Sequence, residues 1–544
     1  MTAVSEPTAV EPKTLAGDST AVAVWTMISR LTGFARIAVI AAVLGPTYLG
    51  STFLAIALLP NLALELLGGA LLASLLVPNL VSTIDRGDRR ATEELAGGFL
   101  GTALVAFGAV ALLAVLAAPL VLAVLGVGID DRAIAADQLR VGWILMAITM
   151  PQLVLYGLAM IAGAVMNAHG RFALASAAPV AENIGGIATM GAVALTFGTG
   201  TDIGSVSLGQ LLLLGLGSTA AVALHATVMV WGARRTKVRL LPRRGWRIPS
   251  VRALLRRMTA SLGQTGLYAL RTFALLTVAN TVPGGVVAFR LALNFLYLPV
   301  QVGARAISLA MLPALSRLHT AGRSQGFQNE YTRGIALIGF LMIPAAVAYF
   351  ILAGPLARAA SFGEMAGTSG PLLVASCLGG LALAVLAESG FQLSIYASYA
   401  RNDARTPFTA TAAGVGVSLG CVPIALWLDG STVLLAVGLA LSAGTGVSAL
   451  YLHRRLLLLL PPPEHAAGRS ILRTLAASAL MAIPVYLTSA FIFSATEGPF
   501  WAIVAVVAAT ATGLATFIAV QLLWRSPELT FFASGLRGML PRGV

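Results

Sequence analysis

Charged residues are scarce in this chain. They make up 10% of its 544 residues, whereas hydrophobic residues make up 58%, and such a composition cannot cover a water-soluble globule with a solvated surface. Cysteine is almost absent, and Cys377 and Cys421 provide neither a disulfide framework nor metal-ligand spacing. We therefore expect an all-α polytopic membrane protein in which both cysteines only pack.

The residue types that carry common enzymatic chemistry are equally sparse. The two lysines, Lys13 and Lys237, follow no glycine-rich phosphate loop, so the chain is not a P-loop ATPase. The five histidines show no HExxH spacing, and the loops are too short to form a soluble catalytic domain. The sequence predicts no enzyme, no metal and no cofactor, and a small membrane-embedded transferase is the one enzymatic alternative left open.

Windows of about 20 apolar residues, the length that spans a bilayer as a helix, recur along the whole chain. They predict fourteen transmembrane helices, at 21–44, 51–82, 95–126, 138–165, 172–197, 206–232, 254–280, 284–316, 332–356, 371–398, 406–428, 431–457, 470–494 and 499–524. The polar residues before the first window are expected to form a disordered tail.

The cations alternate from loop to loop. Basic connections follow every second helix, and the intervening loops are acidic or neutral, so the positive-inside rule places both termini in the cytoplasm. The same distribution accounts for the net charge of +14, and we expect no nucleic-acid partner. The segment from Arg234 to Arg257 holds ten cations and no acid; it either lies on anionic membrane lipids or simply obeys the rule.

Short motifs repeat at nearly one spacing. Pro78 in LLVPNLVS and Pro313 in AMLPALSR are 235 positions apart, and so are Arg36 in TGFAR and Arg271 in TGLYALR. An even number of helices in each copy predicts two parallel six-helix repeats with two further helices after them. The expected organisation is a cytoplasmic tail, an N-terminal lobe, a basic linker, a C-terminal lobe, a second linker, helices 13 and 14, and a cytoplasmic tail, at 1–20, 21–233, 234–253, 254–457, 458–469, 470–525 and 526–544.

Charged and amide side chains interrupt several of the apolar windows. Arg30 and Arg36 lie in the first, Asn61 and Glu65 in the second, and Arg290 in the eighth. A charge near the bilayer centre costs about 2.5 to 3.5 kcal/mol on insertion scales, so it normally faces a partner or a pathway rather than lipid. We expect these helices to line a polar cavity.

Several segments resemble the signatures of the MurJ/MviN family. They are SRLTGFAR, the LPN that contains Pro60, LLVPNL, the RFA after the fourth helix, AMLPALSR and, most distinctively, YARNDARTPF. The resemblance runs from about Ala21 to about Trp524. Members of this family are lipid II flippases of the multidrug/oligosaccharidyl-lipid/polysaccharide exporter superfamily.

The resemblance implies a bacterial inner-membrane protein whose two lobes enclose a cationic cavity for the diphosphate and sugar head group. It also implies a groove for the polyprenyl tail beside helices 13 and 14. Position by position, Arg30, Arg36 and Arg290 match cavity arginines of the family. The implied partner is a lipid II-like polyprenyl-diphosphate-linked glycan, with cell-wall synthesis proteins as further candidates. Guanidinium suits a diphosphate because it forms charge-assisted, often bidentate bonds and does not lose its proton.

The sequence departs from the family pattern at several positions. Ile37 and Ser51 stand where acids are usual, Leu64 and Glu65 replace an arginine pair, and the Gly68–Gly69 pair replaces an acid and a glycine. Three alternatives to lipid II therefore stay open: another polyprenyl-linked polysaccharide precursor, a multidrug or cation antiporter of the same superfamily, and a scaffold without transport.

The individual positions keep alternatives as well. Arg30 lines the cavity or pairs with Glu65, and Arg36 lines it or snorkels to an interface. Five further residues either line the cavity or take part in coupling, or else have a structural role. They are Glu182, Asn183, Arg271, Arg305 and Glu388. Pro60, Pro78 and Pro313 are expected as hinges or as ordinary kinks.

Overall fold

The computed structural model describes residues 12–66, 69–249, 251, 262–367, 369–464, 467–495 and 498–539. The ends of both expected tails, at 1–11 and 540–544, lie outside this set. So do residues 250, 252 and 253 of the expected linker, residues 254–261 of the expected C-terminal lobe, and Gly68. The described part contains helices and no strand, and thirteen of its helical segments are long and apolar enough to cross a membrane. The predicted all-α membrane fold is confirmed. The remaining predicted span, at 254–280, is represented by 18 described residues, Leu262–Ala279.

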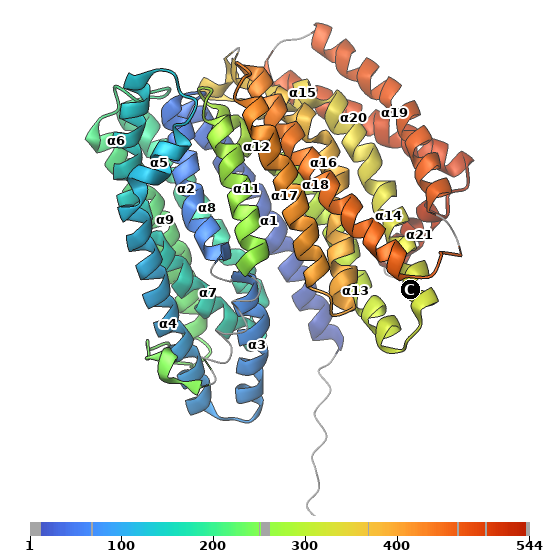
Figure 1. Cartoon of the computed structure of the whole chain (residues 1–544), viewed down its shortest axis with the longest axis horizontal. Coiled ribbons are helices and arrows are strands. Elements are labelled where there is room, and N and C mark those ends of the chain that lie inside the picture. The colour runs from blue at the N-terminus through green and yellow to red at the C-terminus, as the bar shows by residue number, and fades with distance from the viewer. Residues whose placement is uncertain are drawn as a thin grey trace, which may run out of the picture.

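The N-terminal lobe lies on the left of Figure 1, in blue to green. Its helices are α1 (Pro12–Leu44), α2 (Tyr48–Leu66), α3 (Gly69–Asp85), α4 (Arg89–Leu116), α5 (Ala118–Leu125), α6 (Arg132–Thr149), α7 (Gln152–Ala168), α8 (Phe172–Phe197) and α9 (Leu208–Arg234). Loop side chains fix several of the helix starts: the carboxylate of Asp88 accepts from the Ala91 amide, and the hydroxyl of Ser207 accepts from the Gln210 amide.

The C-terminal lobe repeats this order on the right. It follows the short turn η1 (Gly245–Arg247) with α11 (Leu262–Ala279), α12 (Gly285–Pro299), the π-helical η3 (Val300–Ala304), α13 (Arg305–Thr320), α14 (Ser324–Ile351), α15 (Ala353–Ala360), η4 (Gly363–Ala366), α16 (Ser369–Ala400), α17 (Arg405–Ala425) and α18 (Ser431–Leu459). The two eight-residue helices α5 and α15 begin at Ala118 and Ala353, which are 235 positions apart. This spacing, found in short elements that were not predicted, supports the internal duplication.

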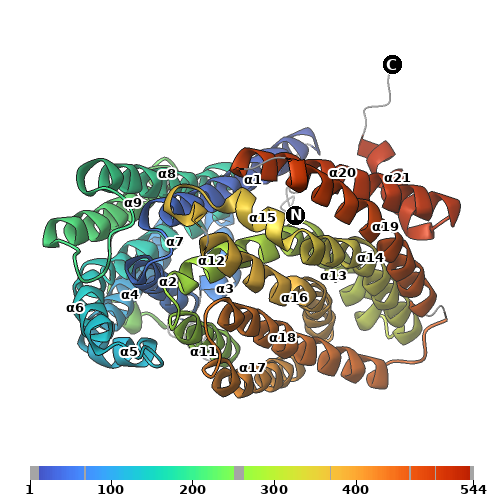
Figure 2. The ribbon, with the colours of Figure 1, turned by 90° about the horizontal axis from the view of Figure 1, so that it is seen from above.

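Helices α19 (Gly468–Ala495), α20 (Pro499–Leu523) and α21 (Pro527–Met539) lie outside the two lobes, against α14 and α15 (Figure 2). Residues 526–544 were expected as a tail, but 527–539 form a helix because their aromatic face packs on α14. The ring of Phe532 stacks on Phe340 at 5.8 Å.

Burial alone would raise the pKa of Glu528, but hydrogen bonds from Ser470 and Ser526 and the charge of Arg473 lower it.

The other expected tail also differs. Helix α1 begins at Pro12, so residues 12–20 are helical rather than disordered. Proline is well accommodated in the first turn of a helix, where its missing N–H would have no partner. Once the membrane span is helical, extending it by further turns costs little. Because residues 12–20 are polar, the sequence pattern did not indicate that they are helical.

The described start of the basic linker packs on α4. The Arg243 amide donates to the Gly97 carbonyl at 2.9 Å, and the Arg243 guanidinium lies 3.4 Å from the Glu94 carboxylate. Gly101 allows this close approach, since a Cβ there would stand 1.9 Å from the Arg243 carbonyl oxygen. Other linker side chains, such as Arg244 and Arg247, remain exposed.

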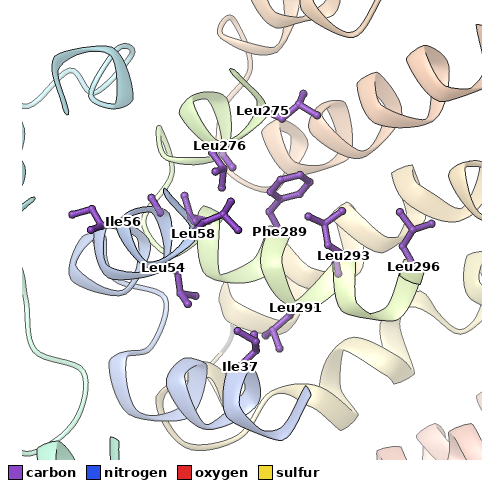
Figure 3. Packing of buried hydrophobic residues seen from close by; sticks show 14 of the residues in the cluster. Ile37, Leu54, Ile56, Leu58, Leu275, Leu276, Phe289, Leu291, Leu293 and Leu296 are labelled. Atoms are coloured by element: carbon purple, nitrogen blue, oxygen red, sulfur yellow. The ribbon is translucent and has the colours of Figure 1, made fainter. Parts of the chain in front are cut away.

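The lobes join at the end of the molecule that carries the acidic and neutral loops. Three side-chain hydrogen bonds cross between them there: Tyr48 Oη to the Thr281 carbonyl at 3.1 Å, Thr199 Oγ1 to Glu364 Oε1 at 2.6 Å, and Asn280 Nδ2 to the Leu125 carbonyl at 2.9 Å. Next to this seam, apolar side chains of α1, α2, α11 and α12 form a shared core. Figure 3 shows Ile37, Leu54, Leu58 and Leu291 gathered in it.

The three candidate hinge prolines all lie inside helices. Pro60 is in α2, Pro78 in α3 and Pro313 in α13. The irregular backbone of the eighth span lies elsewhere, in the π-helical turn at Val300–Ala304 directly after Pro299. Such π-helical turns often occur at functional sites. The hinge role of the three prolines stays a prediction.

Candidate functional site

A cavity on the inner side of the N-terminal lobe collects polar side chains from six helices. Its lining includes Arg36 of α1, Asn61 of α2, Tyr156 of α7, Glu182 of α8 and Arg290 of α12. Gln152 of α7, Ser218 of α9 and apolar residues of α1, α2, α8 and α9 form the rest of its wall. The cavity therefore places two guanidinium groups, one from each lobe, beside a single carboxylate.

Arg36 is fixed on one side of this cavity. Its Nη1 donates to Glu182 Oε1 at 2.8 Å, and the Arg36 side chain remains 26% exposed, whereas that of Glu182 is 11% exposed. Arg36 is therefore paired within the protein and does not snorkel to an interface. A structural role for Glu182 meant a carboxylate held in an ion pair, and Glu182 is held in one here. An ion pair in which one partner stays accessible can exchange that partner for another anion.

Arg290 has no such ion-pair partner within hydrogen-bonding distance among the described residues. Its Nε–H is buried and donates to no acceptor there, although the residue as a whole is half-buried. The charged groups within electrostatic range are Arg36 and Glu65. A buried guanidinium that lacks a hydrogen-bonded carboxylate is costly to keep, and an anion in the cavity would offset that cost.

Arg30 and Arg305 lie toward the other end of the molecule. Arg30 is on α1 and Arg305 is at the start of α13, and both are exposed. The two guanidinium groups lie within electrostatic range of each other. Arg305 Nη1 donates to Gln301 Oε1 at 2.8 Å. Within the described part of the chain no ion pair joins Arg30 to Glu65, so that alternative for Arg30 is wrong in this conformation. The electrostatic neighbour of Glu65 is Arg290.

Arg271 and Glu388 form a polar group inside the C-terminal lobe. Arg271 is 6% exposed; its Nη1 donates to Thr445 Oγ1 of α18 at 3.1 Å, and its guanidinium lies 5.2 Å from the centre of the Tyr268 ring. Glu388 of α16 is within electrostatic range of Arg271. Neither residue lines the cavity that Arg36 and Arg290 share, but Tyr297 of α12 lies within electrostatic range of both of them and of Arg290.

Asn183 has a positioning role. Its Nδ2 donates to the Ser29 carbonyl at 3.1 Å and to Thr32 Oγ1 at 3.0 Å. These bonds tie α8 to α1 one turn before Arg36. The register of α1 against α8, and with it the distance from Arg36 to Glu182, depends on this amide.

Two residues of the cavity network were not singled out by sequence. Tyr156 Oη donates to Glu182 Oε1 at 2.9 Å, and His225 Nδ1 lies 2.9 Å from Glu182 Oε2. An ionisable residue inside an apolar window is a functional candidate by default, and that signal was present at His225. Tyrosine in an apolar helix carries no comparable signal.

Comparisons with known proteins agree on one family. The family model described as "Lipid II flippase MurJ" matches residues 40–525. A Vibrio cholerae protein named "Probable lipid II flippase MurJ" is 25% identical over 450 residues, which cover 79% of this chain and 81% of that protein.

Solved structures show the same fold. A lipid II flippase MurJ in an inward closed conformation superposes with a TM-score of 0.72 at 17% identity, covering 93% of this chain and 98% of that one. An inward-facing multidrug resistance MATE family transporter of the MOP superfamily gives a TM-score of 0.57 at 14% identity, with 83% and 96% covered.

Proposed function

This chain belongs to the MurJ family of lipid II flippases, and on that premise we propose that it carries lipid II, the peptidoglycan precursor, across the membrane. The protein is a multi-pass protein of the bacterial inner membrane. Lipid II joins a glycan to a polyprenyl chain through a diphosphate. The head group would pass from the inner to the outer leaflet by alternating access, while the polyprenyl tail stays in lipid.

One observation carries this proposal: Arg36 and Arg290 come from opposite lobes and line one cavity. A diphosphate crossing a low-dielectric region needs cations that keep their charge, and guanidinium groups do so. An anion bound between the two arginines would contact both lobes. Its arrival and departure can therefore favour different arrangements of the lobes.

The lobe contacts support an inward-facing starting state. Hydrogen bonds join the lobes at the end with the acidic loops, which the positive-inside rule places outside the cell. Both termini would then lie in the cytoplasm. The exposed Arg30 and Arg305 would face the cytoplasmic entrance, where they attract the head group before it reaches Arg36 and Arg290.

The remaining parts of the chain fit accessory roles. Helices α19 and α20 would border the groove for the polyprenyl tail, because their exposed faces carry apolar side chains such as Leu472, Ile483 and Phe500. The exposed arginines of the linker would bind anionic lipids. Cell-wall synthesis proteins would dock at the membrane surface. The cavity moves its substrate without a chemical step, and we assign it no enzymatic activity.

Glu65 favours a second candidate within the same class. A carboxylate near Arg290 weakens the positive potential of the cavity, which suits a substrate with a different polyprenyl-linked glycan. The fold is shared with multidrug transporters, but two cavity arginines disfavour a cationic drug. A scaffold without transport does not account for an accessible arginine pair.

The proposal is tested by depleting the protein in its native cell and identifying the lipid-linked intermediate that accumulates on the cytoplasmic leaflet. Lipid II is the expected product. Accumulation of a different polyprenyl-linked sugar would support the second candidate instead. Accumulation of neither would contradict flipping altogether.

Removing the negative charge of Glu65 is expected to strengthen head-group binding. Glu65 is exposed, so Glu65→Gln should improve affinity by only about two- to fivefold, the effect of a screened charge of about 0.5 to 1 kcal/mol. The measurement is lipid II binding to purified protein at low and high salt, with the gain fading at high salt. Asp429→Asn makes the same charge change in an exposed loop outside the cavity and should leave affinity unchanged.

A further inference from the structure

The carboxylate of Glu182 is the meeting point of three other helices. Arg36 of α1 donates to Oε1 at 2.8 Å, Tyr156 of α7 donates to Oε1 at 2.9 Å, and His225 of α9 lies 2.9 Å from Oε2 through Nδ1. Because a carboxylate only accepts, Nδ1 of His225 must carry the hydrogen. Three donors fix this carboxylate, and the carboxylate in turn holds Arg36 at the cavity wall.

His225 has a free site for a second proton. The residue is 9% exposed, and its Nε2 is buried without a hydrogen-bond partner among the described residues. With Nδ1 protonated, Nε2 of the neutral ring presents a lone pair. Histidine ordinarily titrates near pH 6.5, within the physiological range.

The groups that face His225 come from each neighbouring helix. They are Glu182 from α8, Tyr156 from α7 and, through Glu182, Arg36 from α1. The charged residues of α6 lie in its first turns, where Asp137 approaches Gly204 before α9 begins. Glu182 is thus the one acid at His225 in the described structure, and Arg36 is the cation that shares it.

We propose that His225 is a proton-binding site whose protonation is coupled to the transfer of Arg36 from Glu182 to the diphosphate. When the diphosphate takes Arg36, Glu182 loses its cation. A proton from water then binds Nε2 of His225, and the resulting imidazolium pairs with Glu182 in place of Arg36. The proton returns to water when the substrate leaves. The only covalent bond of the protein that forms and breaks in this cycle is the N–H bond at Nε2 of His225.

This inference rests on the proposed function, because it needs a diphosphate in the cavity. Binding linkage is reciprocal, so a proton taken up with the substrate makes the affinity rise as the pH falls. One linked proton gives at most a tenfold change in affinity per pH unit. The affinity should therefore be higher at pH 6 than at pH 8.

The test is lipid II binding to the full-length purified protein at pH 6, 7 and 8. Lipid II is a suitable probe because both of its phosphates are esterified and keep their charge over this range. Wild-type affinity is expected to fall with rising pH, and calorimetry in buffers of different ionisation enthalpy should detect proton uptake. His225→Gln can still donate to Glu182 but cannot be protonated, so its affinity should be low and independent of pH.

Two further variants separate this role from a structural one. Glu182→Gln removes the charge that holds Arg36, so its affinity should be independent of pH and at least as high at pH 8 as that of wild type at pH 6. His319→Gln, at an exposed histidine of α13, should keep the wild-type dependence. Thermal unfolding of each variant reports whether it is folded.

The outcomes distinguish the two proposals. Binding that does not vary with pH in wild type, or varies equally in His225→Gln, would overturn the proton linkage and leave the flippase proposal intact. Weaker binding in both His225→Gln and Glu182→Gln would also overturn it, because it would show that the network only supports the fold. Absence of lipid II binding in wild type would remove both.

Discussion

Arg290→Ala is expected to abolish lipid II transport while the protein still inserts and accumulates in the membrane. Arg290 is not hydrogen-bonded to a carboxylate in the described structure, so its removal breaks no ion pair that holds helices together. Losing a cation from a buried charge pair with the substrate costs about 2 to 5 kcal/mol, which is roughly 30-fold to several thousand-fold in affinity. Arg30→Ala should also abolish function, since it removes a cation at the entrance.

Complementation of a depleted strain measures this result, with membrane protein levels determined in parallel. Arg317→Ala is the matched control, because it removes an exposed arginine from α13, in the continuation of the same membrane span. It should complement normally. Normal complementation by both Arg290→Ala and Arg30→Ala would rule out the cavity as the head-group site.

The two cavity arginines differ in a way that suits their proposed use. Arg36 is neutralised by Glu182 before substrate arrives, whereas Arg290 is not held by a hydrogen-bonded acid. Arg290 would therefore supply most of the initial attraction, and Arg36 would join only after leaving Glu182. This order makes binding of the anion a two-step event in which the second step rearranges the N-terminal lobe.

Sequence reasoning found the arginines but not the network around them. Arg30, Arg36 and Arg290 stood out because a charge inside an apolar window is costly. The structure brings Arg36 and Arg290 to one cavity, and their binding role stays a prediction. Glu182 lies 146 positions from Arg36, and nothing local in the sequence indicates which helices meet there. Pairing across that distance depends on how α1, α7, α8 and α9 pack.

Backbone irregularities were equally difficult to predict. Pro313 suggested a bend in the eighth span, but the irregular turn is at Val300–Ala304, after Pro299. A proline inside a helix, beyond its first turn, removes one helix hydrogen bond. Whether the backbone responds with a kink or a π turn depends on its neighbours, and here α14 packs closely on this turn: a Cβ on Gly303 would stand 2.4 Å from Met342 Cε.

Gly414→Val is expected to destabilise the C-terminal lobe strongly. A Cβ at Gly414 of α17 would stand 2.0 Å from Ser448 Oγ and 2.2 Å from the Gly444 carbonyl oxygen of α18. Small residues let membrane helices approach at such distances, and close packing is a main source of their association. Overpacking a tight contact costs about 1 to 3 kcal/mol and occasionally more, and a clash with backbone belongs at the upper end of this range.

Gly416→Val is the control for the close contact between α17 and α18. Gly416 lies on the same helix, but a Cβ there meets no atom within 4 Å. Gly416→Val therefore changes helix propensity as Gly414→Val does, without the clash. Thermal unfolding of the purified proteins should show a large loss of stability for Gly414→Val and little change for Gly416→Val. Equal stabilities would show that α17 and α18 do not depend on close contact. Helix α18 also carries Thr445, whose hydroxyl accepts a hydrogen bond from Arg271. Separating α17 from α18 should therefore disturb the polar group inside this lobe. Transport, which depends on movement of the lobes, should fall as well.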